Sequence, residues 1–466
     1  MLLACLLPLA ACAGQAAGPD LGGIYSRAAQ LHGPGRNPVI VIPGILGSRL
    51  VDRDSGAVVW GTNLSGYADP RSAAGARLVA LPLHDGPDVN DEHDAVVADG
   101  ALDRLQLRFF GVPVEVAAYR NLLLTLGAGG YADDTLGTAG GIDYGDDHFT
   151  CFQFAYDWRL DNAENARRLD EFIREKRALV QAEFERRYGV ADYDVRFDIV
   201  AHSMGSLLTR YYLRYGGRSL PADGSLPPLD WAGARYVDRA ILIAPPNGGS
   251  VLALAQLVNG RRIGPLLPHY SPVLLGTMPS LYQLLPRTRH HLVRDGDSRR
   301  PVADLYSFEL WEKMGWGLAA ADADRELRTL LPDVTYPAER RRLALHRLRT
   351  SLERARQFAA AIDVPATPPP GTTLHLFAGD SVLTADRLDV DRRSGALEVE
   401  RFGPGDGTVT RASALMDERQ NGAWSAELRS PVDWASVTFL FADHLGLTRQ
   451  PELSDDLLQL LLEPPR

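Results

Sequence analysis

The chain lacks an excess of positive charge. It carries 49 lysines and arginines against 59 aspartates and glutamates, which gives a net charge of −10. A general nucleic-acid binder is normally basic, so this balance argues against one. The sequence also lacks internal repeats and low-complexity tracts. A hydrophobic share of 45% is ordinary for a soluble folded protein, and 466 residues suffice for a large core.

Cysteine is scarce, with Cys5, Cys12 and Cys151 alone in the sequence. Residues 1–13 form an apolar run that is too short to cross a bilayer as a helix and is typical of a secretory signal. Residues 9–12, Leu-Ala-Ala-Cys, resemble a bacterial lipoprotein processing site. We therefore expect residues 1–12 to be a signal and lipobox segment, and the chain to be exported to the bacterial cell envelope with a lipid anchor on Cys12. Processing would leave Cys151 without a disulfide partner.

Short apolar runs that are typical of buried strands recur along the chain. They lie at residues 38–42, 149–156, 197–200, 240–244, 373–377 and 437–440. Between them, the spacing of apolar residues predicts an amphipathic helix over 162–188. Strands that alternate with helices predict a mostly parallel sheet with helices on both faces. We expect residues 13–36, which are rich in Gly, Ala and Pro, to be a linker, and residues 37–466 to form this α/β domain.

Two long stretches interrupt the alternation of strands and helices. Residues 54–146 lack sustained periodicity apart from one helix, and residues 251–366 contain Pro-rich turns, scattered aromatics and a basic helix over 338–362. The arginines of that helix either form a solvated face or attract anionic head groups. The aromatic residues of the second stretch, Trp311 and Trp316 among them, either form a small core or line a groove for an acyl chain.

A serine lies at a predicted strand-to-helix turn. The apolar run 197–200 precedes Ser203, a helical pattern follows it, and the small residues Ala201 and Gly205 flank it at two positions on each side. This pattern is typical of a nucleophile elbow, in which a strained turn exposes the serine at a helix N-terminus. The alternative is an ordinary turn that happens to hold a serine. We expect Ser203 to be a catalytic nucleophile.

A serine nucleophile needs a base, and the base needs an orienting carboxylate. On a fold with a nucleophile elbow these residues follow in the order serine, acid, histidine. His444 comes directly after the last predicted strand, whereas His202 is expected to be a structural neighbour because adjacent side chains at such a turn diverge. For the acid, the residues alone leave two candidates: Asp406 in a Gly-flanked turn, and Asp380 at the end of a predicted strand.

The oxyanion formed by attack of the serine needs two backbone donors. One candidate is the N–H of Met204, the residue after the nucleophile. The other is the N–H of Ile45, in the Pro-Gly turn after the first strand. This chemistry needs no metal ion and no organic cofactor.

Several motifs occur in a recognisable order. They are Pro38–Ser48, the Tyr-Asp-Trp-Arg run Tyr156–Arg159, the turn at Ser203, Ala244–Ser250, Gly405–Val409 and His444. Together they resemble the lecithin:cholesterol acyltransferase family, which includes lysosomal phospholipase and phospholipid:diacylglycerol acyltransferase. The resemblance implies an α/β-hydrolase fold with a lid at about 54–146 and a cap at about 251–366.

The resemblance also assigns roles to single residues. It implies that Asp406 is the acid and that Asp157 and Trp158 support the pocket. Two departures stand out: Ala201 occupies a position where glycine is usual, and the lid disulfide of the animal members cannot form in this chain.

We therefore expect a serine-dependent acyl ester hydrolase or O-acyltransferase that acts on phospholipid or acylglycerol through an acyl-enzyme on Ser203. A membrane surface is the expected partner. One alternative is a carboxylesterase for small soluble esters. Another, from a different class, is a non-catalytic lipoprotein that binds lipid or a protein on a hydrolase scaffold.

Overall fold

The structure is a computed structural model. It describes residues 18–463 except for 62–67, 87–93, 102–103, 110–111, 118, 136–147, 263–267 and 422–424. The expected signal segment and Cys12 therefore lie outside the described residues, as does the first part of the expected linker.

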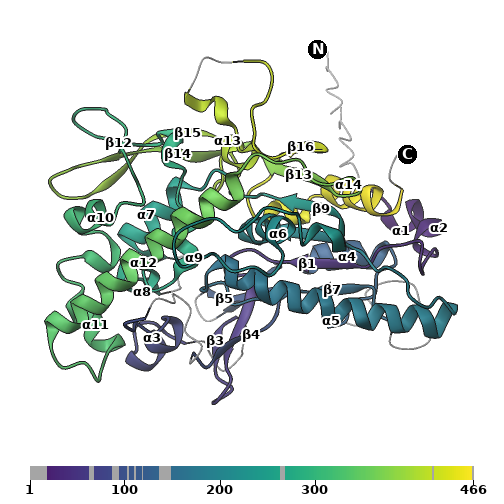
Figure 1. The fold of residues 1–466 in the computed structure, drawn as a ribbon, viewed down its shortest axis with the longest axis horizontal. Coiled ribbons are helices and arrows are strands. Elements are labelled where there is room, and N and C mark those ends of the chain that lie inside the picture. The colour runs from purple at the N-terminus through teal and green to yellow at the C-terminus, as the bar shows by residue number, and fades with distance from the viewer. Residues whose placement is uncertain are drawn as a thin grey trace, which may run out of the picture.

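A six-stranded sheet forms the centre of the fold (Figure 1). In spatial order its strands are β16 (Ser436–Leu440), β13 (Thr373–Gly379), β9 (Val237–Ile243), β8 (Phe197–His202), β1 (Val39–Ile42) and β7 (Cys151–Gln153). Every neighbouring pair is parallel. Strands β1 and β8 are buried along their whole length, as expected of apolar runs in a parallel sheet that is covered on both faces. The sheet confirms the predicted α/β-hydrolase fold class.

Helices cover the sheet and pack on one another. The main ones are α4 (Arg120–Ala128), α5 (Asn162–Tyr188), α6 (Met204–Tyr215), α12 (Pro337–Asp363) and α14 (Pro451–Leu462). Helix α6 packs against β8 and β9, and both α5 and α12 pack against α6. Asp161 caps the start of α5, and Gly189 ends this helix in the left-handed conformation, which glycine adopts easily.

The first inserted stretch contains more strands than its composition indicates. Directly after β2 (Ser48–Asp52), the stretch contains β3 (Val58–Trp60), α3 (Ala73–Val79), β4 (Val96–Ala101), β5 (Arg104–Phe109), β6 (Val112–Ala117) and α4. Strands β2, β3 and β4 form an antiparallel sheet, and β5 pairs with β6. Strand β3 has only three residues and β2 pairs irregularly, so neither leaves a clear period-two signal in the sequence.

The second inserted stretch, residues 251–366, is mostly helical. Before α12 it contains α7 (Val251–Asn259), β10 (Arg261–Arg262), β11 (His269–Tyr270), α8 (Pro272–Leu275), α9 (Pro279–Tyr282), η2 (Thr288–His290), β12 (Val293–Asp295), α10 (Phe308–Met314), η3 (Gly317–Ala319) and α11 (Asp324–Leu330). Trp311 and Trp316 are buried edge to face, with ring centroids 5.5 Å apart. They belong to the same hydrophobic cluster as the central strands.

The arginines of α12 do not all lie on a solvated face. Arg340 is buried and donates to the Asp324 carboxylate at 2.8 Å and to two backbone carbonyls. Arg354 lies 3.0 Å from the buried carboxylate of Asp161. Arg341, by contrast, is exposed. Part of this basic helix therefore serves the packing of the second inserted stretch.

A long hairpin, which the sequence analysis did not predict, follows the strand β13. Strands β14 (Val382–Val390) and β15 (Leu397–Gly405) are antiparallel, and β12 pairs with β14. Beyond the hairpin come α13 (Arg411–Leu415), η4 (Glu418–Asn421) and, after β16, η5 (Gly446–Arg449). The hairpin matters for the site because it returns the chain to the edge of the central sheet at Asp406.

The described part of the expected linker is folded onto the domain. It contains α1 (Leu21–Ile24) and α2 (Ser26–Ala29), which lie beside α14 in Figure 1. Tyr25 is 3% exposed, and its hydroxyl donates to the Asp455 carboxylate of α14 at 2.7 Å. Residues 18–36 therefore pack as part of the domain rather than extend from it as a free linker.

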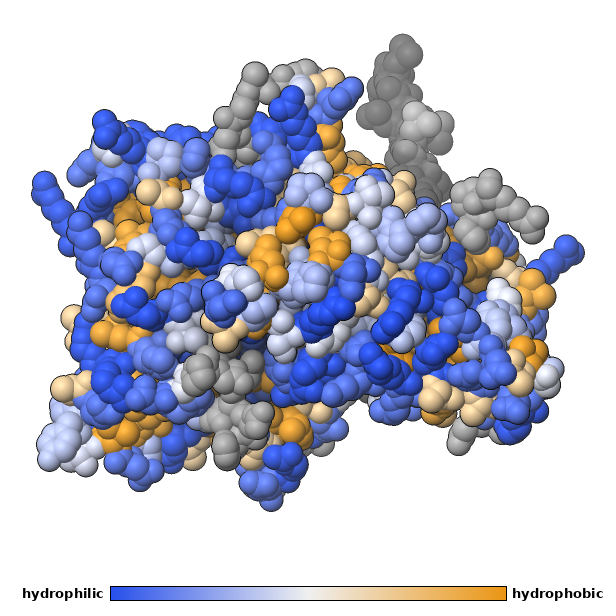
Figure 2. Space-filling view, viewed as in Figure 1, coloured by the Kyte–Doolittle hydropathy of each residue, from blue (hydrophilic) through white to orange (hydrophobic). Residues whose placement is uncertain are grey.

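The surface carries no large apolar band on the face shown in Figure 2, where hydrophobic residues form small groups between hydrophilic ones. Within the described ranges, no helix combines the length and the apolar character needed to cross a bilayer.

The position of Trp311 leads to a prediction about stability. Trp311→Ala should lower the free energy of unfolding by about 3–5 kcal/mol, because it removes a fully buried indole from a packed cluster. Tyr336→Ala is the matched control from the same inserted stretch: this side chain is 74% exposed, and the expected change is below about 0.5 kcal/mol. Urea unfolding of both variants provides the measurement. Equal losses would mean that the tryptophan does not hold the inserted stretch together.

Candidate active site

The chain makes a strained turn at Ser203 between β8 and α6. Ser203 has φ 52° and ψ −123°, a backbone conformation that residues other than glycine rarely adopt. The turn brings α6 so close to β1 that a Cβ atom on Gly205 would lie 2.3 Å from the Pro43 carbonyl oxygen. Ala201 is completely buried within β8, so the backbone accommodates its methyl group in place of glycine.

The side chains of Ser203, His444 and Asp406 form a continuous hydrogen-bonded series. His444 Nε2 lies 2.9 Å from Ser203 Oγ, and His444 Nδ1 lies 2.7 Å from Asp406 Oδ2. The other carboxylate oxygen of Asp406 accepts backbone N–H groups of Thr408 at 2.9 Å and Val409 at 2.7 Å. The three residues come from three separate loops, and all three line one cavity.

The environment of Asp406 keeps its carboxyl group ionised. Burial by itself would raise the pKa of this group, which is 2% exposed. The adjacent His444 and the two backbone donors outweigh burial, so the pKa of Asp406 is lowered. Asp380, the other candidate from the sequence, forms an ion pair with Arg411 and does not line the cavity. The structure therefore brings Asp406, and not Asp380, to the histidine.

His202 takes part in a second chain of hydrogen bonds behind the site. The Tyr119 hydroxyl accepts the Gly44 N–H at 2.7 Å and lies 2.9 Å from His202 Nδ1. His202 Nε2 lies 3.0 Å from the His444 carbonyl oxygen, which can only accept. Nε2 must therefore carry the proton, and the Tyr119 hydroxyl must donate to Nδ1. Burial, together with the nearby His444, lowers the pKa of His202 to about 3, so its ring is neutral at ordinary pH.

This second chain joins the turn after β1 to the loop that carries His444. Sequence reasoning expected a structural role for His202 but did not single out Tyr119, which directly precedes α4 in the first inserted stretch. Trp60, whose indole N–H donates to the Leu46 carbonyl at 2.8 Å, was also missed. A lone aromatic residue in such a stretch carries no positional signal.

The expected oxyanion donors lie at the ends of two neighbouring strands. Met204 is the first residue of α6, so its N–H has no acceptor within the helix. Ile45 follows β1 and lines the cavity. Neither N–H donates a hydrogen bond within the described part of the chain, so both are free to bind a ligand oxygen.

The Tyr-Asp-Trp-Arg motif braces the turn after β1. The Tyr156 hydroxyl donates to the Pro43 carbonyl at 3.0 Å, and the indole N–H of Trp158 donates to the Ser48 carbonyl at 3.3 Å. Asp157 forms a buried ion pair with Arg159 at 2.7 Å. Of the two expected supporting residues, Trp158 lines a narrow extension of the cavity. Asp157 lines neither the cavity nor its extension, and its partner Arg159 donates to the carbonyls of Leu78 and Ala80 at the end of α3.

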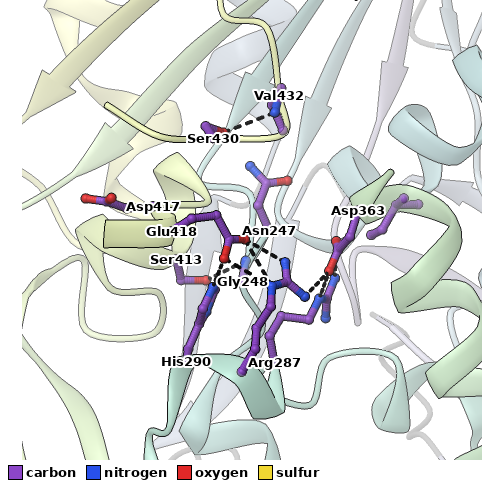
Figure 3. Close-up of polar contacts among 12 residues, drawn as sticks. Asn247, Gly248, Arg287, His290, Asp363, Ser413, Asp417, Glu418, Ser430 and Val432 are labelled. Atoms are coloured by element: carbon purple, nitrogen blue, oxygen red, sulfur yellow. Dashed lines mark hydrogen bonds and ion pairs between the residues drawn. The ribbon is translucent and has the colours of Figure 1, made fainter. Parts of the chain in front are cut away.

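The loop after β9 is fixed to the loop that follows Asp406 (Figure 3). The Gly248 N–H donates to both the carbonyl and the hydroxyl of Ser413, at 3.0 and 3.1 Å, and the Asn247 amide donates to the backbone of α13 at 2.7 Å. Ser250 then donates to the Thr408 carbonyl at 2.9 Å. These contacts hold the cavity wall that contains Ser250 next to the loop that carries Asp406.

The cavity has a volume of 470 Å³. Its apolar lining comes from the turn after β1, from both inserted stretches, from the loop that carries Asp406 and from the loop around His444: Ile45, Leu46, Trp60, Leu252, Ala253, Leu281, Leu284, Val409 and Leu445. Trp311 and Trp316 do not line it. Thus the second inserted stretch contributes both to a core and to the cavity wall, through different residues.

The parallel sheet and the strand–serine–helix turn place this chain among the α/β hydrolases. A crystal structure of the Tle4–Tli4 complex supports the assignment: it aligns with a TM-score of 0.53 and 16% identity, over 92% of this chain and 98% of that one. Lipase 1 from Pelosinus fermentans aligns over 92% and 100% at 12% identity and a TM-score of 0.31. Phospholipase PlaB from Legionella pneumophila aligns over 69% and 52% at 14% identity and a TM-score of 0.30.

Residues 141–302 match the model of the lecithin:cholesterol acyltransferase family. This match confirms the resemblance predicted from the motifs, and it spans the segment that contains Ser203. It supports an enzyme that acts on lipid esters as a hydrolase or acyltransferase. No curated protein sequence matches the chain.

The Tyr119 contacts predict a specific loss of stability. Tyr119→Phe keeps the ring but leaves the Gly44 N–H and His202 Nδ1 without a partner, and it should cost about 1–3 kcal/mol of unfolding free energy. Tyr212→Phe is the control, because that buried hydroxyl has no partner among the described residues. It should be neutral or stabilising. Chemical denaturation measures the unfolding free energy of both variants. An unchanged unfolding free energy in Tyr119→Phe would contradict the hydrogen-bond chain through Tyr119 and His202.

Proposed function

We propose that this protein is a serine-dependent acyl hydrolase or O-acyltransferase of lipid esters. The observation that carries the proposal is the hydrogen-bonded series Ser203–His444–Asp406 at the wall of a largely apolar cavity. The family match supports the substrate class, and the hydrogen bonds that join Ser203, His444 and Asp406 support catalysis over a purely binding role.

In the proposed first step, Ser203 Oγ attacks the ester carbonyl carbon while His444 Nε2 takes the serine proton. Asp406 keeps the imidazole in the tautomer with Nδ1 protonated and stabilises the imidazolium that forms. The negative charge on the carbonyl oxygen is bound by the N–H groups of Ile45 and Met204. Collapse of the intermediate breaks the ester bond, His444 gives its proton to the leaving alcohol, and the acyl group stays on Ser203.

In the second step, an acceptor hydroxyl attacks the acyl-enzyme and His444 again moves the proton. Water as acceptor gives hydrolysis, whereas an alcohol gives acyl transfer. The same residues serve both outcomes, so the competition depends on which acceptor the cavity admits.

The lining of the cavity favours a lipid over a small soluble ester. Its apolar side chains come mainly from the two inserted stretches, and a short polar ester would leave this surface uncovered.

We also propose that the chain works at a membrane surface of the bacterial cell envelope, anchored through Cys12. Phe441, three residues before His444 and 83% exposed, supports contact with such a surface.

Substitution of the two candidate acids tests the mechanism. Asp406→Asn should lower kcat by about 10⁴, because the amide stabilises the wrong histidine tautomer. Asp380→Asn, the matched control, breaks an ion pair outside the cavity and should retain activity within about three-fold. The assay compares hydrolysis of phospholipid, triacylglycerol and a short p-nitrophenyl ester, each with and without an alcohol acceptor. An inactive Asp380→Asn beside an active Asp406→Asn would overturn the assignment.

A further inference from the structure

Two polar side chains in the cavity wall have no partner among the residues that the structure describes. The amide of Gln256 and the guanidinium of Arg261 line the cavity that contains Ser203. Neither makes a hydrogen bond or ion pair with any residue that the structure describes. Both also line the small extension of 20 Å³ behind it, so they stand where the main cavity narrows.

The local structure holds both residues toward the cavity. On α7, Leu252, Ala253 and Gln256 line the cavity from the same side of the helix. Gly260 ends α7 with φ 78°, a conformation suited to glycine, and Arg261 follows at once in β10. Arg261 pairs across the ladder with Tyr270 of β11. Its position is therefore set by a helix end and a strand pair, and no charged side chain among the described residues pairs with it.

Other charged groups in the cavity do not neutralise Arg261. Asp406 is engaged by His444, and Asp443 lies at the exposed rim, where one of its oxygens accepts the Gly446 N–H at 2.7 Å. Burial lowers the pKa of Arg261, which reflects the loss of hydration around its guanidinium. An unpaired, partly desolvated cation destabilises a fold unless a ligand supplies the missing charge. A residue that weakens the fold without a compensating contact is typical of a functional site.

We propose that Arg261, with Gln256 beside it, is a subsite for an oxyanion carried by the lipid ligand: the phosphate of a phospholipid ester, or the carboxylate of a fatty acid. The proposal rests on the proposed function, since it places this anion in the same cavity as the ester that Ser203 attacks. The planar guanidinium can donate two parallel hydrogen bonds to such a group, and the amide can add a third. A neutral acylglycerol offers no group of this kind.

Binding of lipids that cannot be cleaved tests the subsite without catalysis. The probes are a short dialkyl-ether phosphatidylglycerol below its micelle concentration, the matching dialkylglycerol, and octanoate, each titrated by calorimetry. Arg261→Gln should weaken binding of the ether phospholipid about 10- to 100-fold, the usual contribution of a charge-assisted hydrogen bond, and change dialkylglycerol binding by less than about two-fold. Arg261→Lys, which keeps the charge without the planar fork, should give a smaller loss.

Two controls exclude indirect effects. Arg393→Gln removes the same charge from an exposed turn outside the cavity and should leave all three affinities unchanged. The melting temperature of Arg261→Gln should equal or exceed that of the wild type, because the variant removes an unpaired cation. A lower melting temperature together with equal losses for charged and neutral lipids would mean that Arg261 supports the cavity structurally, and the subsite would be wrong.

The two lipid anions are distinguished by the same titrations. Loss of ether phospholipid binding assigns the subsite to the substrate phosphate, and loss of octanoate binding alone assigns it to the fatty acid carboxylate. Unchanged binding of both in Arg261→Gln overturns the subsite. Because the ether lipid has no carboxylic ester for Ser203 to attack, that result leaves the proposed function standing. Absent turnover of acyl esters with intact Arg261-dependent binding would overturn the function alone.

Discussion

The site depends on one constraint: the strands of the central sheet run parallel, so their carboxyl ends meet at one edge. The turn with Ile45 follows β1, Ser203 follows β8, the loop Ala244–Ser250 follows β9, and His444 follows β16. Gly379 ends β13 at the same edge, and its lack of a side chain leaves room for Asp406: a Cβ atom on Gly379 would lie 2.8 Å from Asp406 Cβ. Groups far apart in sequence are thereby held within hydrogen-bond distance of one another by a rigid scaffold.

Buried polar contacts then fix what the sheet brings together. Tyr119 and His202 connect the turn after β1 to the main chain of His444, and the Tyr156 hydroxyl donates to the Pro43 carbonyl of the same turn. The Asp406 carboxylate is hydrogen-bonded to His444 and to two backbone N–H groups. Within a low-dielectric interior such contacts are strong when every member is satisfied, which is the condition for a preorganised site. In the cavity wall, by contrast, neither the Arg261 guanidinium nor the Gln256 amide has a partner among the described residues, and this is the basis of the proposed oxyanion subsite.

Much of this arrangement could be predicted from the sequence. The strands of the sheet leave continuous apolar runs, and Ser203 lies in a short motif with a steric cause. The choice between Asp406 and Asp380 could not be made from the residues, because each follows a strand-like or turn-like segment. The deciding element is the β14–β15 hairpin, whose exposed residues carry no strong pattern yet return Asp406 to the sheet edge. The sequence also does not distinguish which apolar residues of the second inserted stretch reach the cavity. Leu281 lines the cavity, whereas Trp311 is buried away from it.

Covalent labelling tests directly whether Ser203 is the nucleophile. The folded protein would be treated with a fluorophosphonate carrying an alkyl chain, digested, and analysed by mass spectrometry. We expect a single adduct on the peptide that contains Ser203, at Oγ, and no adduct in Ser203→Ala. An adduct on another residue, or a folded wild-type protein that stays unlabelled, would mean that Ser203 is not the nucleophile.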